Sequence, residues 1–83
     1  MTREELAKVA TDTYTALVTA AEESRAQESR AMDAVITSLP REQVATAAHM
    51  LAVQMNDRYM ESMRKAKAVL DVIMKAVEDM PEE

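Results

Sequence analysis

Pro40 is the one proline in the interior of an 83-residue chain that contains no glycine. Tight turns with positive backbone φ need glycine, so β-sandwiches and barrels are disfavoured. Proline lacks an N–H and clashes with a preceding helical turn, so a helix that approaches Pro40 has to end near Thr37. The same proline suits the first turn of a second helix, with Ser38 or Leu39 as its cap. The sequence therefore predicts an all-α chain with one sharp turn.

Two long helices are predicted on either side of this turn. Thr2 followed by Glu5 matches the capping box that starts a helix, and no breaker follows until the turn. We expect a first helix over about residues 3–37, a turn at 38–40 and a second helix over about 40–79, followed by Pro81. A connection this short places the helices antiparallel. Residues 1–83 are thus predicted to form a single helical-hairpin domain.

Apolar side chains recur along the second helix in alternating steps of four and three, which is the pattern of a coiled-coil seam. One additional step of four, from Met55 to Tyr59, is a stutter that relaxes supercoiling locally. Counting outward from the turn places Leu51 near Glu28 of the first helix. The seam of the hairpin is predicted to contain Leu17, Val35, Leu51, Met55, Tyr59, Met63, Leu70, Ile73 and Val77.

The apolar surface of the second helix is wider than one neighbouring helix can cover. Val69, Val72 and Met74 broaden the seam, and a further apolar flank lies away from it. A pair of helices builds no enclosed core, and chains of this size are near the limit at which one core suffices. We therefore expect a homodimer in which two hairpins form a four-helix bundle.

That flank is the candidate surface for docking on another protein. Its positions recur at i, i+3, i+7, i+10 and i+14, the spacing used when a helix binds in a groove, and methionine is flexible enough for adaptable contacts. The alternative is that the second copy covers the methionines. The flank consists of Met50, Val53, Asp57, Met60 and Arg64.

Glu28 is the polar residue that falls on the inward stripe of the first helix. A carboxylate at such a position is costly unless it is paired, and Arg58 is at the edge of the opposite seam. We expect a polar layer that fixes helix register or oligomeric state, in preference to a catalytic acid, because no second carboxylate lies beside it.

No enzymatic activity, metal or cofactor is expected. His49 is the only histidine, and no acid stands one helical turn away from it as a second metal ligand. The serines have only this histidine as a base, and a chain without glycine has no phosphate-cradling loop. With no cysteine, disulfides and cysteine zinc sites are excluded.

The charge and hydropathy patterns indicate the class of partner. Ten basic residues against fifteen acids give a formal net charge of −5, which argues against binding nucleic acid. No apolar run approaches the ~18 residues of a membrane span, and the N-terminus lacks the pattern of a secretory signal, so we expect a cytoplasmic protein without membrane contact. The acids at the open end of the hairpin are interpreted as a solvated end, with mimicry of a phosphate backbone as the alternative: Glu4, Glu5, Glu78, Asp79, Glu82 and Glu83.

These features predict a non-enzymatic protein-binding regulator or inhibitor that occupies a surface on a larger protein. Compact acidic hairpins of this kind are similar in size and plan to phage-encoded proteins that bind host machinery, and the similarity implies a host protein as the partner. The alternative is a structural or assembly component, a scaffold or chaperone, whose apolar face is used up by copies of the same chain.

Overall fold

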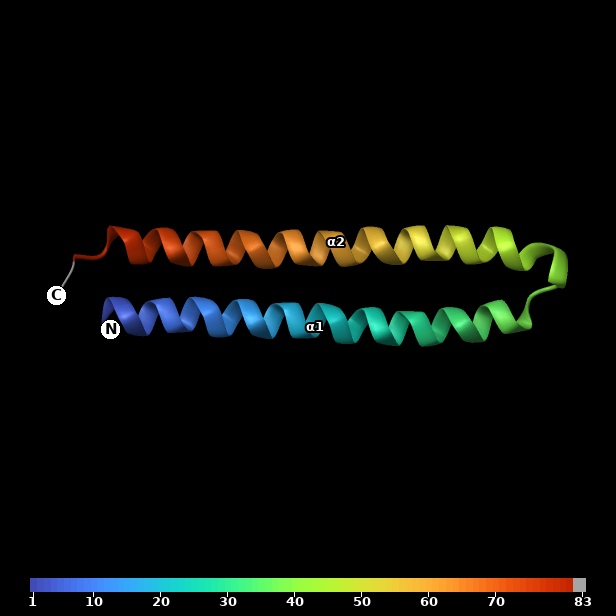
Figure 1. Cartoon of the computed structure of the whole chain (residues 1–83), viewed down its shortest axis with the longest axis horizontal. Helices are drawn as coiled ribbons and strands as arrows, with labels where there is room; N and C mark the ends of the chain where they lie inside the picture. Colours follow the sequence, from blue (N-terminus) through green and yellow to red (C-terminus); the bar gives the residue numbers. More distant parts are fainter. Residues whose placement is uncertain (82–83) are drawn as a thin grey trace.

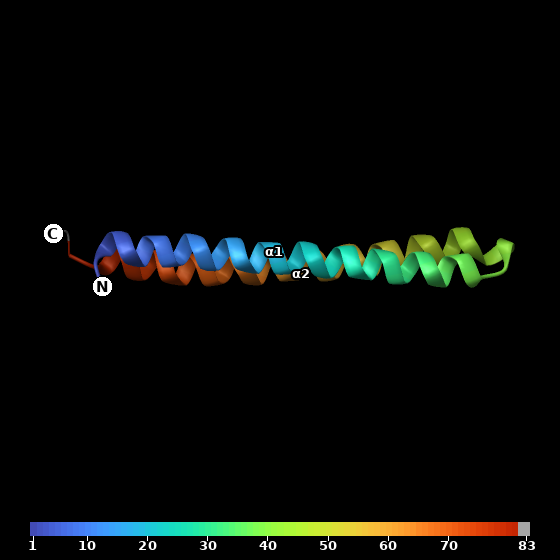
Figure 2. The same ribbon diagram turned by 90° about the horizontal axis from the view of Figure 1, so that it is seen from below.

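In a computed structural model, which describes residues 1–81, two long helices lie side by side and run in opposite directions (Figure 1). Helix α1 spans Arg3–Ser38 and helix α2 spans Arg41–Asp79. The described residues contain no strand, and they form a rod with extents of 65 × 15 × 9 Å. The prediction of an all-α chain built as a helical hairpin is confirmed. Seen after a 90° turn, the two helices cross at a shallow angle (Figure 2).

The start of α1 is fixed by the predicted capping box. The Thr2 hydroxyl accepts a hydrogen bond from the backbone N–H of Glu5 at 3.1 Å, and the Glu5 carboxylate accepts one from the backbone N–H of Thr2 at 3.4 Å. Two backbone donors that the first helical turn leaves without partners are thereby satisfied. Glu4 and Glu5 also place negative charge at the positive end of the helix dipole.

The turn between the helices consists of two extended residues, Leu39 and Pro40. The Leu39 N–H donates to the Ile36 carbonyl at 3.2 Å and closes α1, and the Pro40 carbonyl accepts from the Gln43 N–H at 2.9 Å and opens α2. The predicted cap is therefore wrong, because Pro40 itself is the N-cap residue of α2 and no side chain caps this helix. Ser38 belongs to α1, and its hydroxyl donates back to the Ala34 carbonyl at 3.0 Å. Each helix boundary at the turn lies one residue later than the sequence predicts.

The contact between the helices is narrow, and most of its buried side chains are small. Four of the described residues are buried, and three of these are alanines: Ala10, Ala21, Ala66 and Val77. Larger side chains along the line of α2 predicted as the seam are only half-buried, namely Leu51, Met55, Tyr59, Met63, Leu70 and Ile73. Alanine at the contact line lets the two backbones approach, but it leaves no enclosed core of large side chains.

The inward stripe of α1 differs from the prediction by one position at two places. Leu17 and Val35 are 38% and 52% exposed, whereas the adjacent Val18 and Ile36 are half-buried. Each pair offers two neighbouring apolar residues about 100° apart around the helix, so periodicity alone does not choose between them. The side-chain packing selects the second member of each pair, and Leu17 and Val35 are left on an open side of α1.

Candidate functional site

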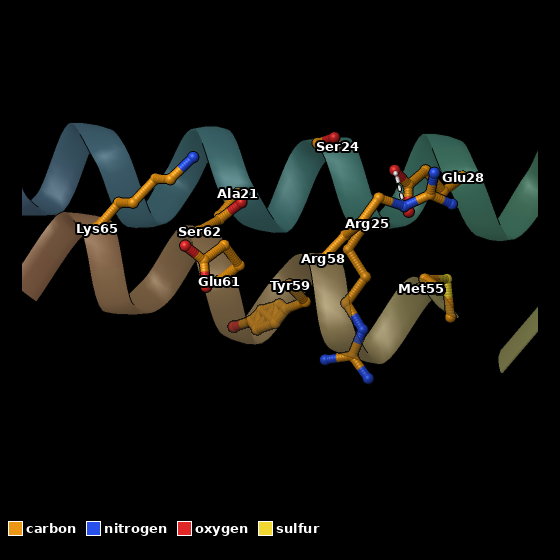
Figure 3. Close-up of a pocket in the computed structure, with 10 residues that line it drawn as sticks. All are labelled: Ala21, Ser24, Arg25, Glu28, Met55, Arg58, Tyr59, Glu61, Ser62 and Lys65. Carbon is orange, nitrogen blue, oxygen red and sulfur yellow. Dashed lines mark ion pairs between the residues drawn. The ribbon is translucent and has the colours of Figure 1, made fainter. Parts of the chain in front are cut away.

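A polar layer crosses the middle of the hairpin, where two arginines reach over to the opposite helix (Figure 3). Arg58 extends from α2, and its Nε atom lies 3.3 Å from Oε1 of Glu28 on α1. Arg25 extends from α1, and its guanidinium carbon lies 4.6 Å from the centre of the Tyr59 ring on α2. Glu28 is half-buried, with 28% of its side chain exposed, and it has the partner that the sequence suggested. The contact between Arg25 and Tyr59 was not foreseen, although both side chains are long enough to bridge the helices.

The layer also shows that the helix register differs from the one counted outward from Pro40. Glu28 lies across from Met55 and Arg58 (Figure 3), about one helical turn further along α2 than Leu51. Around this layer is a half-open hollow of about 280 Å³ with a mixed polar and apolar lining. Its carboxylates and guanidiniums are paired or face solvent, so the hollow offers charged and hydrogen-bonding groups.

The predicted docking flank lies on the outer side of α2. Met50, Val53 and Met60 are 57%, 46% and 54% exposed. At ~3.6 residues per turn Met50 and Val53 are roughly half a turn around α2 from the middle of the seam, and Met60 is about a third of a turn from it. Asp57 and Arg64 are exposed on the same side, as part of the outer flank Met50, Val53, Asp57, Met60 and Arg64.

Arg64 on this flank forms an ion pair with Glu61 within α2. The pair has i,i+3 spacing on an exposed helix surface, so it contributes little to stability. The guanidinium therefore remains available to exchange its partner for a carboxylate on another protein at small cost. The outer flank thus combines three apolar side chains with one acid and one base.

A second apolar surface, which the sequence indicated only in part, runs along one side of the hairpin. We call it the lateral groove. Its first section, of about 320 Å³, lies between the helices, and its second lies on α2 and shares Val69 with the first. The main apolar residues of the lateral groove are Leu17, Ala21, Ala66, Val69, Val72 and Ile73. The sequence predicted the α2 part of the lateral groove, because Val69 and Val72 widen the apolar stripe of that helix. The exposure of Leu17 depends instead on how α1 packs against α2.

The remaining candidate groups are dispersed. His49 is exposed on α2, away from the polar layer. Residues 1–81 hold no cluster of three histidine, cysteine or acidic side chains that suits a metal ion. Within the same range, neither helix has a stretch apolar enough to cross a membrane. Of the acids at the open end, Glu82 and Glu83 lie outside the described residues.

The ammonium group of Lys8 has a shifted pKa. The Nζ atom of Lys8 lies 2.6 Å from a carboxylate oxygen of Asp12, one turn along α1. The hydrogen bond to Asp12, and then its negative charge, raise the pKa of Lys8 above its ordinary value. The pair lies on the exposed side of α1, so it bears on the stability of this helix rather than on the polar layer.

No protein family, curated protein or solved structure matches this chain.

Proposed function

We propose that this chain is a non-enzymatic protein-interaction module, a small regulator that pairs with a second copy of itself and binds a larger protein through the outer flank of α2. The observation that carries the proposal is the exposure of Met50, Val53 and Met60 on the side of α2 that faces away from α1. Three large apolar side chains clustered on one helix surface typically mark an interaction site. Binding there would block or redirect the activity of the larger protein.

The chemistry of the flank suits a groove on a folded partner. Methionine side chains adapt to irregular apolar surfaces, and the spacing presents one continuous ridge along about four helical turns. Asp57 and Arg64 on the same side provide polar contacts that set orientation. The polar residues elsewhere support the non-enzymatic part of the proposal, since the exposed His49 has no acid one turn away to orient it.

Self-pairing into a four-helix bundle is supported by the surface area of the isolated hairpin. A folded monomer of 9.2 kDa typically exposes about 4,900 Å², whereas this chain exposes 6336 Å². The excess is about 1,400 Å² per chain, and stable protein interfaces bury roughly 800 Å² or more on each partner. One hairpin therefore exposes enough additional surface to form an obligate dimer.

The proposed partner site is tested with Met60→Asp, compared with Asn56→Asp. Each variant adds one negative charge to the same exposed stretch of α2, but only Met60→Asp removes an apolar side chain from the outer flank. Tagged wild-type and variant proteins are used to capture partners from extract of the source cell, or of its host if the gene is viral, and the captured protein is then purified and its binding measured.

We expect one protein that binds the wild type and Asn56→Asp but not Met60→Asp, while far-UV circular dichroism and dimer mass are the same for all three. Retention of the purified partner by Met60→Asp would contradict the proposed site. Loss of the dimer in Met60→Asp would instead assign the outer flank to self-association.

A second candidate function, an assembly component, is favoured by the presence of apolar residues on more than one side of α2. The lateral groove and the outer flank point in different directions, and two such surfaces on one subunit can link copies into larger species. Light scattering over a concentration series separates the candidates. Growth past a dimer supports assembly, and a dimer that stays constant supports the regulator.

A further inference from the structure

We infer that the second copy of this chain covers the side of the hairpin that contains the lateral groove, so that α1 and α2 both contact it and the outer flank stays free. The inference rests on the self-pairing included in the proposed function, and it names the surface that this pairing uses. We call this side the lateral face. Its large exposed apolar residues are Val9, Leu17 and Val35 of α1 and Val69 and Val72 of α2.

On α1 the lateral face continues beyond the groove toward both ends of the rod. Val9 and Val35 lie within about a quarter of a turn of Leu17 around the helix at ~3.6 residues per turn. These two valines are 41% and 52% exposed, and Leu17 lines the groove between them. The apolar face of α1 therefore extends over roughly 40 Å, from residue 9 to residue 35 at ~1.5 Å per residue.

The same quarter turn of α1 lacks charge along the helix. From Leu6 to Ser38 it contains only valine, leucine, alanine, serine, threonine and glutamine, whereas all eleven charged residues of α1 project elsewhere. Charged residues make up 30% of the chain, so a long exposed helix surface without any of them is an exception in this protein. Depletion of charge together with exposed apolar side chains is typical of the core of a protein interface.

On α2 the lateral face follows the groove toward the open end of the hairpin. Val69 is 39% exposed and lines both sections of the groove, and Val72 in the second section is 71% exposed. Among the described residues, Lys65 is the charged one that lines the groove. Its long stem can cover apolar surface while the ammonium group reaches water at the rim, so Lys65 is compatible with a second hairpin placed on this face.

The dimensions of the rod favour the lateral face over the outer flank for self-pairing. A side that presents both helices, as in the view of Figure 1, measures 65 × 15 Å, whereas the side that presents α2 alone measures 65 × 9 Å. The first has an area above the roughly 800 Å² that each partner buries in a standard interface, and the second has an area below it. Contact with both helices is also the arrangement of a four-helix bundle.

The face is tested by the reactivity of single cysteines in the full chain, which has no native cysteine. Val35→Cys probes the lateral face, and Val53→Cys on the outer flank is the matched control, because the two valines are 52% and 46% exposed in the hairpin. At a concentration at which sedimentation shows the dimer, iodoacetamide should alkylate Val35→Cys about tenfold or more slowly than Val53→Cys, because the second copy covers only the first thiol.

Charged substitutions at the same two positions test the energetics of the face. Val35→Asp should raise the dimer dissociation constant about 100-fold or more, because it buries a charge on each copy, while Val53→Asp should change it less than about threefold. The alkylation readout does not depend on the folding of Val35→Asp.

Equal alkylation rates in a protein that sediments as a dimer would overturn the lateral face as the surface of self-pairing. Slower alkylation of Val53→Cys than of Val35→Cys would move self-pairing to the outer flank. A chain that sediments as a monomer at every concentration would overturn the self-pairing of the proposed function, and this inference with it. Failure of the partner-capture experiment alongside the predicted protection of Val35→Cys would refute the partner site alone, and this inference would stand.

Discussion

The Nε atom of Arg58 on α2 lies 3.3 Å from Oε1 of Glu28 on α1, in the same layer in which Arg25 of α1 covers the ring of Tyr59 on α2. Each helix thus sends one arginine to a partner on the other. This reciprocal layer lies where the stripe of α1 is poorest in apolar residues. Both contacts form at the observed register of the two helices, and polar groups within an apolar seam can favour one register in this way.

The ion pair between Glu28 and Arg58 is expected to stabilise the hairpin only slightly. Arg58 is 60% exposed, and ion pairs in contact with water contribute about 0.2–1 kcal/mol. A double-mutant cycle of Glu28→Ala, Arg58→Ala and the double variant, followed by urea unfolding at one fixed protein concentration, measures the coupling. The coupling should shrink as salt is added. A salt-independent coupling above about 2 kcal/mol would show a desolvated pair instead.

Removal of the Arg25 guanidinium that lies over the Tyr59 ring should also destabilise the hairpin only slightly. Arg25→Ala is expected to lower the free energy of unfolding by about 0.5–1 kcal/mol, the range for a cation over an aromatic face at an exposed site. In the matched experiment, Arg25→Ala is introduced into a Tyr59→Leu background, where the ring is absent. In this background, Arg25→Ala should lower the free energy of unfolding by a smaller amount. An equal cost in the two backgrounds would show that Arg25 acts through helix propensity or packing alone.

The burial of alanine between the helices predicts that the stability of the fold depends strongly on side-chain size there. Ala10 is fully buried, so Ala10→Leu should force the helices apart and destabilise the fold by about 1–3 kcal/mol. Ala26→Leu, at an exposed position of the same helix, should be nearly neutral, because leucine is almost as good a helix former as alanine. Thermal unfolding of both variants measures the difference. Equal melting temperatures would contradict the interface described here.

Lys8 should titrate above its ordinary pKa, because Asp12 holds its ammonium in a hydrogen bond. A folded-state pKa raised above the unfolded value adds stability that is fully present below the unfolded pKa of 10.5 and is lost as the pH rises through the folded value. An NMR titration of the Lys8 side chain should show the raised pKa in the wild type and a lower one in Asp12→Asn. The same pKa in the two proteins would refute the contribution of Asp12.

The line of half-buried positions on the second helix was predictable because its apolar residues repeat in a strict pattern over many turns. The structure leaves that line half-buried or buried from Leu51 to Val77, across the stutter at Tyr59. The N-terminal capping box was predictable too, because it depends on two residues that are local in sequence.

The first helix and the register were harder to predict, for two physical reasons. Adjacent apolar residues, such as Leu17 with Val18, leave the inward side undecided by roughly one residue until the partner helix selects it. Counting outward from Pro40 also assumes that the helices leave the turn level with each other, whereas side-chain packing shifts Glu28 toward Met55 and Arg58. The lateral groove follows from these same packing choices, so the sequence showed only its α2 part.

Sedimentation equilibrium of the purified chain, combined with circular dichroism over the same dilution series, is the most direct measurement. A hairpin whose second helix has more apolar surface than its first can cover should sediment at twice the chain mass of 9.2 kDa and lose helix content as it dissociates on dilution. A fully helical species of 9.2 kDa that persists at nanomolar concentration would contradict this account, because two helices alone would then suffice for a stable fold.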